Sequence, residues 1–339
     1  MESDMESRVG YYLNVFLLTP VIILGLVGNC LSMLTWGLGR HRDTSTAVLL
    51  TALAATDTIV LVVPALEMWA YEIFQYWLRL PNVVFCKFFA WASYVGPTVS
   101  SWIIVLITAE RFVSIWFPMK VRYLCSRYKV RIFIVVVYVI MALVYGPFLI
   151  VTDLHDDYNS SIFNNLTCNL KKNGSFHLYI FPIWMWLDLI LLFMVPFFFV
   201  LTGNSLILYK LIKSRKILKK GEPQASTRTR VANAFTIRAI ALSFVMLVCL
   251  FPVSIQEVYN AHKSVTPSGL VHVIVRILLY ANSSFNFILY CAIGSGFRED
   301  MKAVLVNLCL RKKVRLDSYD GNMSTHNSTH FTRIRTDTV

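Results

Sequence analysis

Polar side chains lie inside several long apolar segments of this 339-residue chain. A charged residue at the centre of a membrane-spanning helix costs about 2.5 to 3.5 kcal/mol on insertion scales, so each one needs a partner or a function. A carboxylate surrounded by hydroxyl and amide oxygens suits a small hard cation. We expect an allosteric sodium ion, with no other cofactor required, or alternatively a hydrogen-bonded polar core without an ion. The site would consist of Asn29, Asp57, Ser100, Asn282, Ser283 and Asn286.

A second group of side chains combines charge with aromatic surface, in the halves of the apolar segments that lie away from the most basic loops. Three carboxylates against one guanidinium predict a cavity for a ligand with a cationic group, which the aromatic rings can also contact. The alternative is that these side chains pair with one another or face lipid headgroups. The members are Glu67, Trp69, Tyr94, Trp184, Asp188, Gln256, Glu257, Arg276 and Tyr280.

The elements that must position both groups are apolar helices. The chain is 56% hydrophobic and 15% charged, and its mean hydropathy is +0.59, which excludes an ordinary soluble fold. About 20 apolar residues in a helix cross a bilayer. We therefore predict an all-α membrane protein, a seven-transmembrane helix bundle followed by a short amphipathic eighth helix. The spans are expected at 12–38, 46–71, 84–117, 130–152, 177–211, 235–261 and 269–293.

The distribution of basic residues predicts the orientation of the bundle. Most of the 32 Lys and Arg residues lie in segments 120–131 and 210–238 and after the last span. Under the positive-inside rule these segments are cytoplasmic, which places the N-terminus outside and the C-terminus inside the plasma membrane. Topology thus accounts for the net charge of +13, and nucleic acid is not needed as a partner.

The expected domain organisation follows from these spans. We predict an extracellular N-terminus at 1–11, a bundle at 12–293, an amphipathic helix at 294–310 and a flexible cytoplasmic tail at 311–339. The amphipathic helix would lie on lipid of the inner leaflet. Cys309 at its end is a candidate palmitoylation site, and the alternative is an unmodified thiol.

Two of the seven cysteines, Cys86 and Cys168, fall on the extracellular side, which is oxidising, and we expect them to form a disulfide. The loop that contains Cys168 also carries three Asn-x-Ser/Thr acceptor motifs for glycosylation. The acceptor residues are Asn159, Asn165 and Asn173.

Most of the expected spans carry one short motif each. These motifs are Gly28-Asn29, Leu53-Ala-Ala-Thr-Asp57, Glu110-Arg111-Phe112, Pro196, Cys249-Leu-Phe-Pro252 and Asn286-Phe-Ile-Leu-Tyr290. In combination they resemble the rhodopsin-like (class A) G-protein-coupled receptors, over the whole bundle. The resemblance implies that Glu110, Arg111 and Phe112, with Asn286 and Tyr290, form the activation motif. Arg111 would then contact the G protein after the helices open. The alternative is that Arg111 merely reaches the headgroups.

The chain departs from the family pattern at several switch positions. Leu250 replaces the tryptophan of the sixth helix, Phe287 the proline of the seventh, and Asn204 the tyrosine of the fifth. We therefore expect an activating rearrangement with a different trigger. Leu250 combined with the Asn-Ser-Ser-x-Asn-Phe pattern of the seventh helix resembles invertebrate neuropeptide receptors of the FMRFamide and myosuppressin kind.

Two other ligand classes are disfavoured by single positions. Tyr280 occupies the position of the retinal-binding lysine of opsins, and Ser93 the position of the aspartate of amine receptors. We therefore predict a neuropeptide receptor that activates a heterotrimeric G protein. A receptor for a small lipid or metabolite is the alternative. An ion-coupled transporter or channel that uses Asp57 and Glu67 is more distant.

Further partners are expected at the cytoplasmic side. The Ser- and Thr-rich tail suits a receptor kinase and arrestin. The terminal Asp337-Thr338-Val339 matches a PDZ ligand. We find no catalytic triad, phosphate-binding loop or metal cluster in the sequence, so we do not expect an enzyme.

Overall fold

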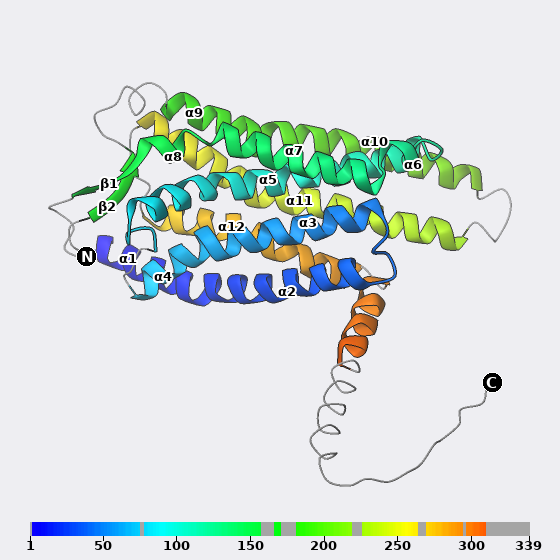
Figure 1. Cartoon of the computed structure of the whole chain (residues 1–339), viewed down its shortest axis with the longest axis horizontal. Coiled ribbons are helices and arrows are strands. Elements are labelled where there is room, and N and C mark those ends of the chain that lie inside the picture. Colours follow the sequence, from blue (N-terminus) through cyan, green and yellow to red (C-terminus); the bar gives the residue numbers. More distant parts are fainter. Residues whose placement is uncertain are drawn as a thin grey trace, which may run out of the picture.

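The structure is a computed structural model that describes residues 2–74, 78–156, 166–170, 181–218, 226–263, 269–293 and 296–309. Its core is a bundle of seven membrane-spanning helical columns (Figure 1). The predicted fold class and the seven spans are therefore confirmed, and the chain is a multi-pass membrane protein.

The first two columns are each built from three helical segments, and the third is a single helix. The first contains α1 (Glu2–Leu13), η1 (Asn14–Leu18) and α2 (Thr19–Leu38). The second contains α3 (Ser45–Val60), η2 (Leu61–Ala65) and α4 (Leu66–Phe74). The third is the single helix α5 (Val83–Trp116), followed by the short α6 (Val121–Leu124).

The remaining columns complete the bundle. The fourth contains α7 (Arg127–Val144) and α8 (Phe148–Val151), and the fifth contains α9 (Phe181–Asp188), η4 (Leu189–Met194) and α10 (Val195–Leu218). The sixth is α11 (Ser226–Lys263) and the seventh is α12 (Gly269–Ile293). A C-terminal helix follows at 296–309. α11 begins nine residues before the predicted span, in a segment that is not apolar but contains Arg and Ala residues of good helix propensity.

Wide π-helical turns interrupt the second and fifth columns next to prolines. η2 contains Pro64, and η4 ends just before Pro196. A proline has no N–H and its ring clashes with the preceding turn, so the helix widens there. Glu67 follows η2 and Asp188 precedes η4 directly. The two turns therefore set the directions in which these two carboxylates point.

Glycines allow the first and seventh columns to approach closely. A Cβ added at Gly28 would lie 2.6 Å from the Phe287 Cβ, and one added at Gly25 would lie 2.3 Å from the Ser284 Oγ. Small residues at helix interfaces are the usual way in which membrane helices reach van der Waals contact. The close approach brings Asn29 within reach of α12, where its Nδ2 donates to the Ser283 carbonyl at 3.0 Å.

The N-terminus and a two-stranded antiparallel sheet lie at the same end of the bundle (Figure 1). The sheet pairs β1 (Thr152–Asp156) with β2 (Leu166–Leu170), and Leu154 faces Cys168 in the register. Cys168 forms a disulfide with Cys86 at the start of α5, which confirms the predicted pairing. The disulfide holds the strand pair over the end of the third column.

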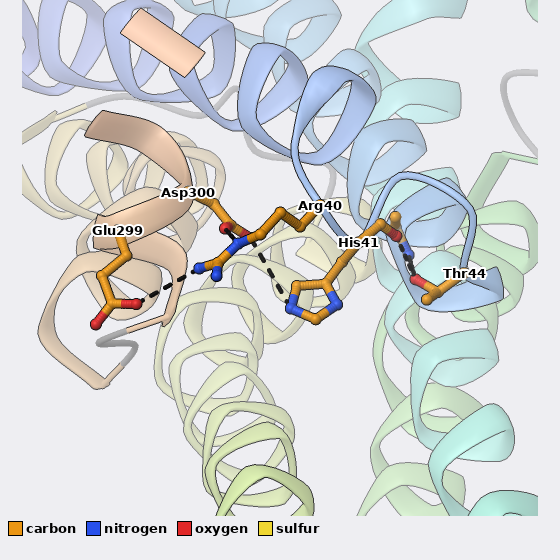
Figure 2. A network of polar contacts seen from close by, with 6 residues as sticks. Arg40, His41, Thr44, Glu299 and Asp300 are labelled. Atoms are coloured by element: carbon orange, nitrogen blue, oxygen red, sulfur yellow. Dashed lines mark hydrogen bonds and ion pairs between the residues drawn. The ribbon is translucent and has the colours of Figure 1, made fainter. Parts of the chain in front are cut away.

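The C-terminal helix (residues 296–309) runs across the bundle axis at the opposite end (Figure 1). Phe297 is buried against Trp36 and Tyr290, at ring distances of 5.3 and 5.6 Å. Polar contacts join the same helix to the turn after α2 (Figure 2). The Arg40 Nε donates to the buried Asp300 carboxylate at 2.5 Å, and this hydrogen bond raises the pKa of the Arg40 guanidinium.

Candidate functional site

The Asp57 carboxylate is fully buried inside the bundle, between α3, α5 and α12. The Ser100 hydroxyl donates to Oδ1 at 2.7 Å, and the Asn286 Nδ2 donates to Oδ2 at 2.5 Å. Ser283 is a further hydrogen-bond partner of the carboxylate. Three of the residues predicted around Asp57 thus contact it. Asn282 is buried on α12, but no hydrogen bond joins it to Asp57 among the described residues.

This donor set fits a hard cation in part. The carboxylate and the hydroxyls of Ser100 and Ser283 are oxygen ligands of the kind that such a cation takes. The Asn286 amide, in contrast, presents its nitrogen to Asp57 and would have to turn to offer its oxygen. The arrangement as it stands is a satisfied hydrogen-bond network that ties α3, α5 and α12 together.

The Glu110–Arg111 pair lies near the C-terminal end of α5 and is bound to the start of α3. The Arg111 Nε lies 3.1 Å from the Glu110 Oε2. The other carboxylate oxygen, Oε1, accepts from the Ser45 and Thr46 hydroxyls at 3.0 and 3.2 Å. Arg111 also donates to the Thr46 Oγ1. The guanidinium is therefore held inside the bundle in this conformation, and Phe112 stacks on Trp116 beside it.

Tyr290 is buried in an aromatic cluster near the same end. Its ring packs edge-on against Trp36 at 6.0 Å and against Phe297. Phe287, which stands where the family has a proline, contacts Phe297 at 6.1 Å. α12 continues through this position without a break. The cluster connects the end of α12 to the C-terminal helix.

A cavity of about 190 Å³ lies in the half of the bundle that carries the disulfide. Six of the nine residues predicted to surround a ligand line it, namely Glu67, Tyr94, Asp188, Glu257, Arg276 and Tyr280. The other three lie nearby but outside its wall. The Trp69 Nε1 donates to the Thr19 hydroxyl at 2.8 Å, Trp184 packs edge-on against Phe148, and Gln256 is half-buried on α11 beside Glu257.

Two of the three carboxylates in this cavity are neutralised by arginines. Arg79, in the turn between α4 and α5, binds Glu67 through two hydrogen bonds of 2.5 Å. Arg276 of α12 binds Glu257 of α11. The pairing that the sequence left open is therefore present for Glu257. The sequence analysis did not single out Arg79. It is the one charged residue in the segment from 73 to 86, and this isolated charge could have identified it as a candidate partner for a carboxylate.

The third carboxylate, Asp188, has a different environment. It accepts a hydrogen bond from the Tyr145 hydroxyl at 2.6 Å and is almost fully buried. In the described part of the chain, no Lys, Arg or His lies within ion-pair distance of it. Tyr145 stacks with Tyr94 at 5.7 Å, and Tyr94 stacks on Phe148 at 4.6 Å. The cavity therefore offers one unpaired carboxylate next to aromatic faces.

Several predicted positions fall at or beyond the limits of the described residues. Cys309 is exposed at the end of the C-terminal helix, where a lipid could reach it. The glycosylation acceptors Asn159, Asn165 and Asn173 lie outside the described residues, as does the tail with its Asp337-Thr338-Val339 end. These modifications and partners stay predictions.

Comparison with known proteins identifies a family for the bundle. The sequence profile described as "7 transmembrane receptor (rhodopsin family)" matches residues 28–290. The chain is 22% identical to the growth hormone secretagogue receptor type 1 of Sus scrofa over 82% of its length and 76% of that receptor. It is 24% identical to the FMRFamide receptor of Drosophila melanogaster, over 95% of this chain and 59% of that receptor. It is also 22% identical to the thyrotropin-releasing hormone receptor of Gallus gallus, over 94% and 85% respectively.

Proposed function

This chain belongs to the rhodopsin family of seven-transmembrane receptors, and from that premise we propose that its ligand is an extracellular peptide with a cationic group. The family implies coupling to a G protein and a ligand from outside, and it is a receptor family, not an enzyme family. The observation that carries the proposal is Asp188, the one cavity carboxylate without an ion-pair partner among the described residues.

The charges of the cavity support a cationic ligand group. With its carboxylates and arginines ionised and His272, which also lines it, neutral, the cavity holds three carboxylates and two guanidinium groups. One negative charge is left, and the paired geometry assigns it to Asp188. A buried carboxylate without a counter-ion is costly, so a ligand cation that reaches it gains more than it would in water. The ring of Tyr94, which lines the cavity and stacks on Tyr145, adds cation-π surface.

The size of the cavity supports insertion of one end of a peptide. Pockets that enclose a drug-sized ligand have about 300 to 1,000 Å³, and this one has about 190 Å³. A peptide would therefore place one or two residues inside and leave the rest outside. Relatives whose names specify peptides, among them the FMRFamide receptor of Drosophila melanogaster, make a peptide ligand plausible for a chain of this sequence.

The orientation in the membrane is part of the proposal. The disulfide lies at the end of the bundle that also carries the N-terminus, and disulfides form in oxidising compartments (Figure 1). The opposite end carries Arg111, the basic segment 120–131 and the C-terminal helix. We therefore place the N-terminus outside the plasma membrane, with the coupling motif Glu110, Arg111, Phe112, Asn286 and Tyr290 facing the G protein.

The experiment is a G-protein dissociation assay in cells that express this chain, with a panel of amidated peptides that contain arginine. Each active peptide is compared with its citrulline analogue, which has a similar shape but no charge. We expect the analogue and the Asp188→Asn variant to lose potency to a similar extent. The two changes together should lose little more than either alone, because they remove the same interaction.

Two variants separate failure of the ligand proposal from failure of coupling. Asp153→Asn makes the same chemical change on β1, outside the cavity, and should leave potency unchanged. Arg111→Ala should retain peptide binding and lose the G-protein signal. If the receptor is expressed at the surface but responds to no peptide of the panel, the peptide proposal is wrong, and lipids and small metabolites are tested next. Full potency of the citrulline peptides would contradict only the proposed role of Asp188 and would leave the peptide proposal in place.

A further inference from the structure

A second cavity, of about 230 Å³, lies between α10 and α11 in the half of the bundle near the cytoplasmic end. Its described lining is formed by apolar side chains and three polar ones, Asn204, Ser205 and Ser243, and no ionisable residue is among them. Leu201, Leu208 and Phe244 of the lining are between 47% and 66% exposed on the outside of the bundle. The cavity therefore opens toward the hydrocarbon of the membrane.

Asn204 is the distinctive group in this cavity. Its side chain is only 8% exposed, and its Nδ2 donates to the Ser243 hydroxyl at 2.7 Å. The carbonyl oxygen of the same amide, Oδ1, is buried and has no hydrogen-bond partner among the described residues. Buried polar atoms are nearly always bonded, and inside a bilayer no bulk water replaces a missing donor.

The depth of Asn204 makes water an unfavourable partner. Asn204 lies nine residues before Lys213 at the inner end of its span, which is about 14 Å at 1.5 Å per residue. A buried water normally makes two to four hydrogen bonds. Asn204 Oδ1 is the one lining atom in the described part of the chain that is buried without a partner. An acyl chain of the membrane would fill the cavity but would leave this oxygen unsatisfied.

We propose that this cavity binds a neutral, apolar alcohol or phenol from the bilayer, whose hydroxyl group donates to the Asn204 Oδ1. The volume equals that of about eight water molecules, which suits a single substituted ring or the hydroxyl-bearing end of a longer molecule. Among the described residues, the lining offers no ionisable partner for a charged headgroup. The site is independent of the extracellular ligand, because the cavity on α10 and α11 shares no lining residue with the one that contains Asp188.

The test uses the full-length receptor in lipid nanodiscs and a photoreactive alkylphenol that carries a diazirine. After irradiation, peptides from α10 and α11 are analysed by mass spectrometry. Two competitors are compared, an unlabelled 2,6-dialkylphenol and its methyl ether, which has the same apolar body without the donor. We expect the phenol to compete about tenfold better than the ether, which corresponds to about 1.4 kcal/mol.

Variants show whether the competition depends on Asn204. Asn204→Leu should abolish the difference between phenol and ether. Ser205→Ala is the matched control, because the Ser205 hydroxyl lines the same cavity but already donates to the Leu201 carbonyl at 2.8 Å. Leu201→Trp should reduce labelling by blocking the mouth while Asn204 is retained. The competition by phenol and by ether is also compared on the unmodified receptor, so the proposal can be tested even if a variant fails to fold.

Three results would overturn the proposal. Equal competition by phenol and ether would show an acyl-chain groove with no role for the amide. No labelling of α10 or α11 would show that the cavity is filled by water or by the protein itself. A preference for the phenol that survives in Asn204→Leu would place the hydroxyl-binding group elsewhere.

Discussion

The outer cavity and the inner end of the bundle each contain arginine–glutamate pairs, but the pairs are built differently. In the cavity, Arg276 and Glu257 belong to different helices, and Arg79 reaches Glu67 from a turn. At the inner end, Arg111 and Glu110 are neighbours in α5, and hydroxyls of α3 hold them. The outer pairs break when their elements separate, whereas the inner pair moves as one unit.

This difference indicates how the two ends respond to a ligand. A ligand cation bound at Asp188 would repel the Arg276 guanidinium in the same cavity and so shift α12 relative to α11. At the inner end, residues 226–256 of α11 contain no Asp or Glu that could hold Arg111. The restraint seen on Arg111 comes from Thr46 and Glu110 instead. Activation would then require a displacement between α5 and α3.

The largest expected effect is at the unpaired outer carboxylate. Asp188→Asn keeps the shape and the bond from Tyr145 but removes the charge. Loss of one partner of a buried charged contact costs about 2 to 5 kcal/mol, so we expect a loss of peptide potency of at least about thirtyfold. Concentration–response curves for G-protein dissociation measure it. Unchanged potency would show that Asp188 is a structural partner of Tyr145 only.

The second effect is on stability and concerns the bidentate outer pair. Arg79→Gln leaves Glu67, which is 1% exposed, without its cation. We expect about 2 to 3 kcal/mol of destabilisation, toward the low side for a broken buried pair because Arg79 is itself a quarter exposed. Thermal unfolding of the purified receptor measures this. The double variant Glu67→Gln with Arg79→Gln should recover part of the loss, and a double variant as unstable as the single one would argue against the pairing.

The third effect sharpens the contrast at the inner end. Thr46→Val removes the hydroxyl that contacts both Glu110 and Arg111, and hydrogen bonds to charged groups contribute about 1.5 to 3 kcal/mol. We expect basal G-protein activation to rise severalfold, measured at equal surface expression. Ser114→Ala is the control, since the Ser114 hydroxyl donates to the Glu110 backbone carbonyl and not to its carboxylate. Equal basal activity in the two variants would contradict the proposed restraint.

Sequence reasoning succeeded where one-dimensional patterns decide the outcome. Hydropathy and length predicted the seven spans, and the position of two cysteines on the oxidising, extracellular side predicted the Cys86–Cys168 disulfide. It could not supply the pairing of Arg79 with Glu67, because that contact depends on the path of the turn before α5. Nor could it find the cavity at Asn204, since the rotation of a helix about its axis decides whether an amide faces a neighbour or lipid. Partner choice is a three-dimensional property that composition leaves open.

The smallest expected effect concerns the network of Figure 2, which joins the C-terminal helix to the turn after α2. Asp300→Asn replaces the buried acceptor of Arg40 with a neutral one, while the guanidinium, 66% exposed, keeps water as an alternative partner. Arg40 is charged at neutral pH, as arginines in proteins are, and the hydrogen bond to Asp300 raises its pKa further. We expect amide hydrogen exchange in residues 296–309 to accelerate no more than a fewfold.

Phe297→Ala should accelerate this exchange far more, because it removes the buried ring that packs on Trp36 and Tyr290. If Asp300→Asn had the larger effect, polar contacts would hold the C-terminal helix in place, and the inner end would then resemble the outer cavity in depending on charge.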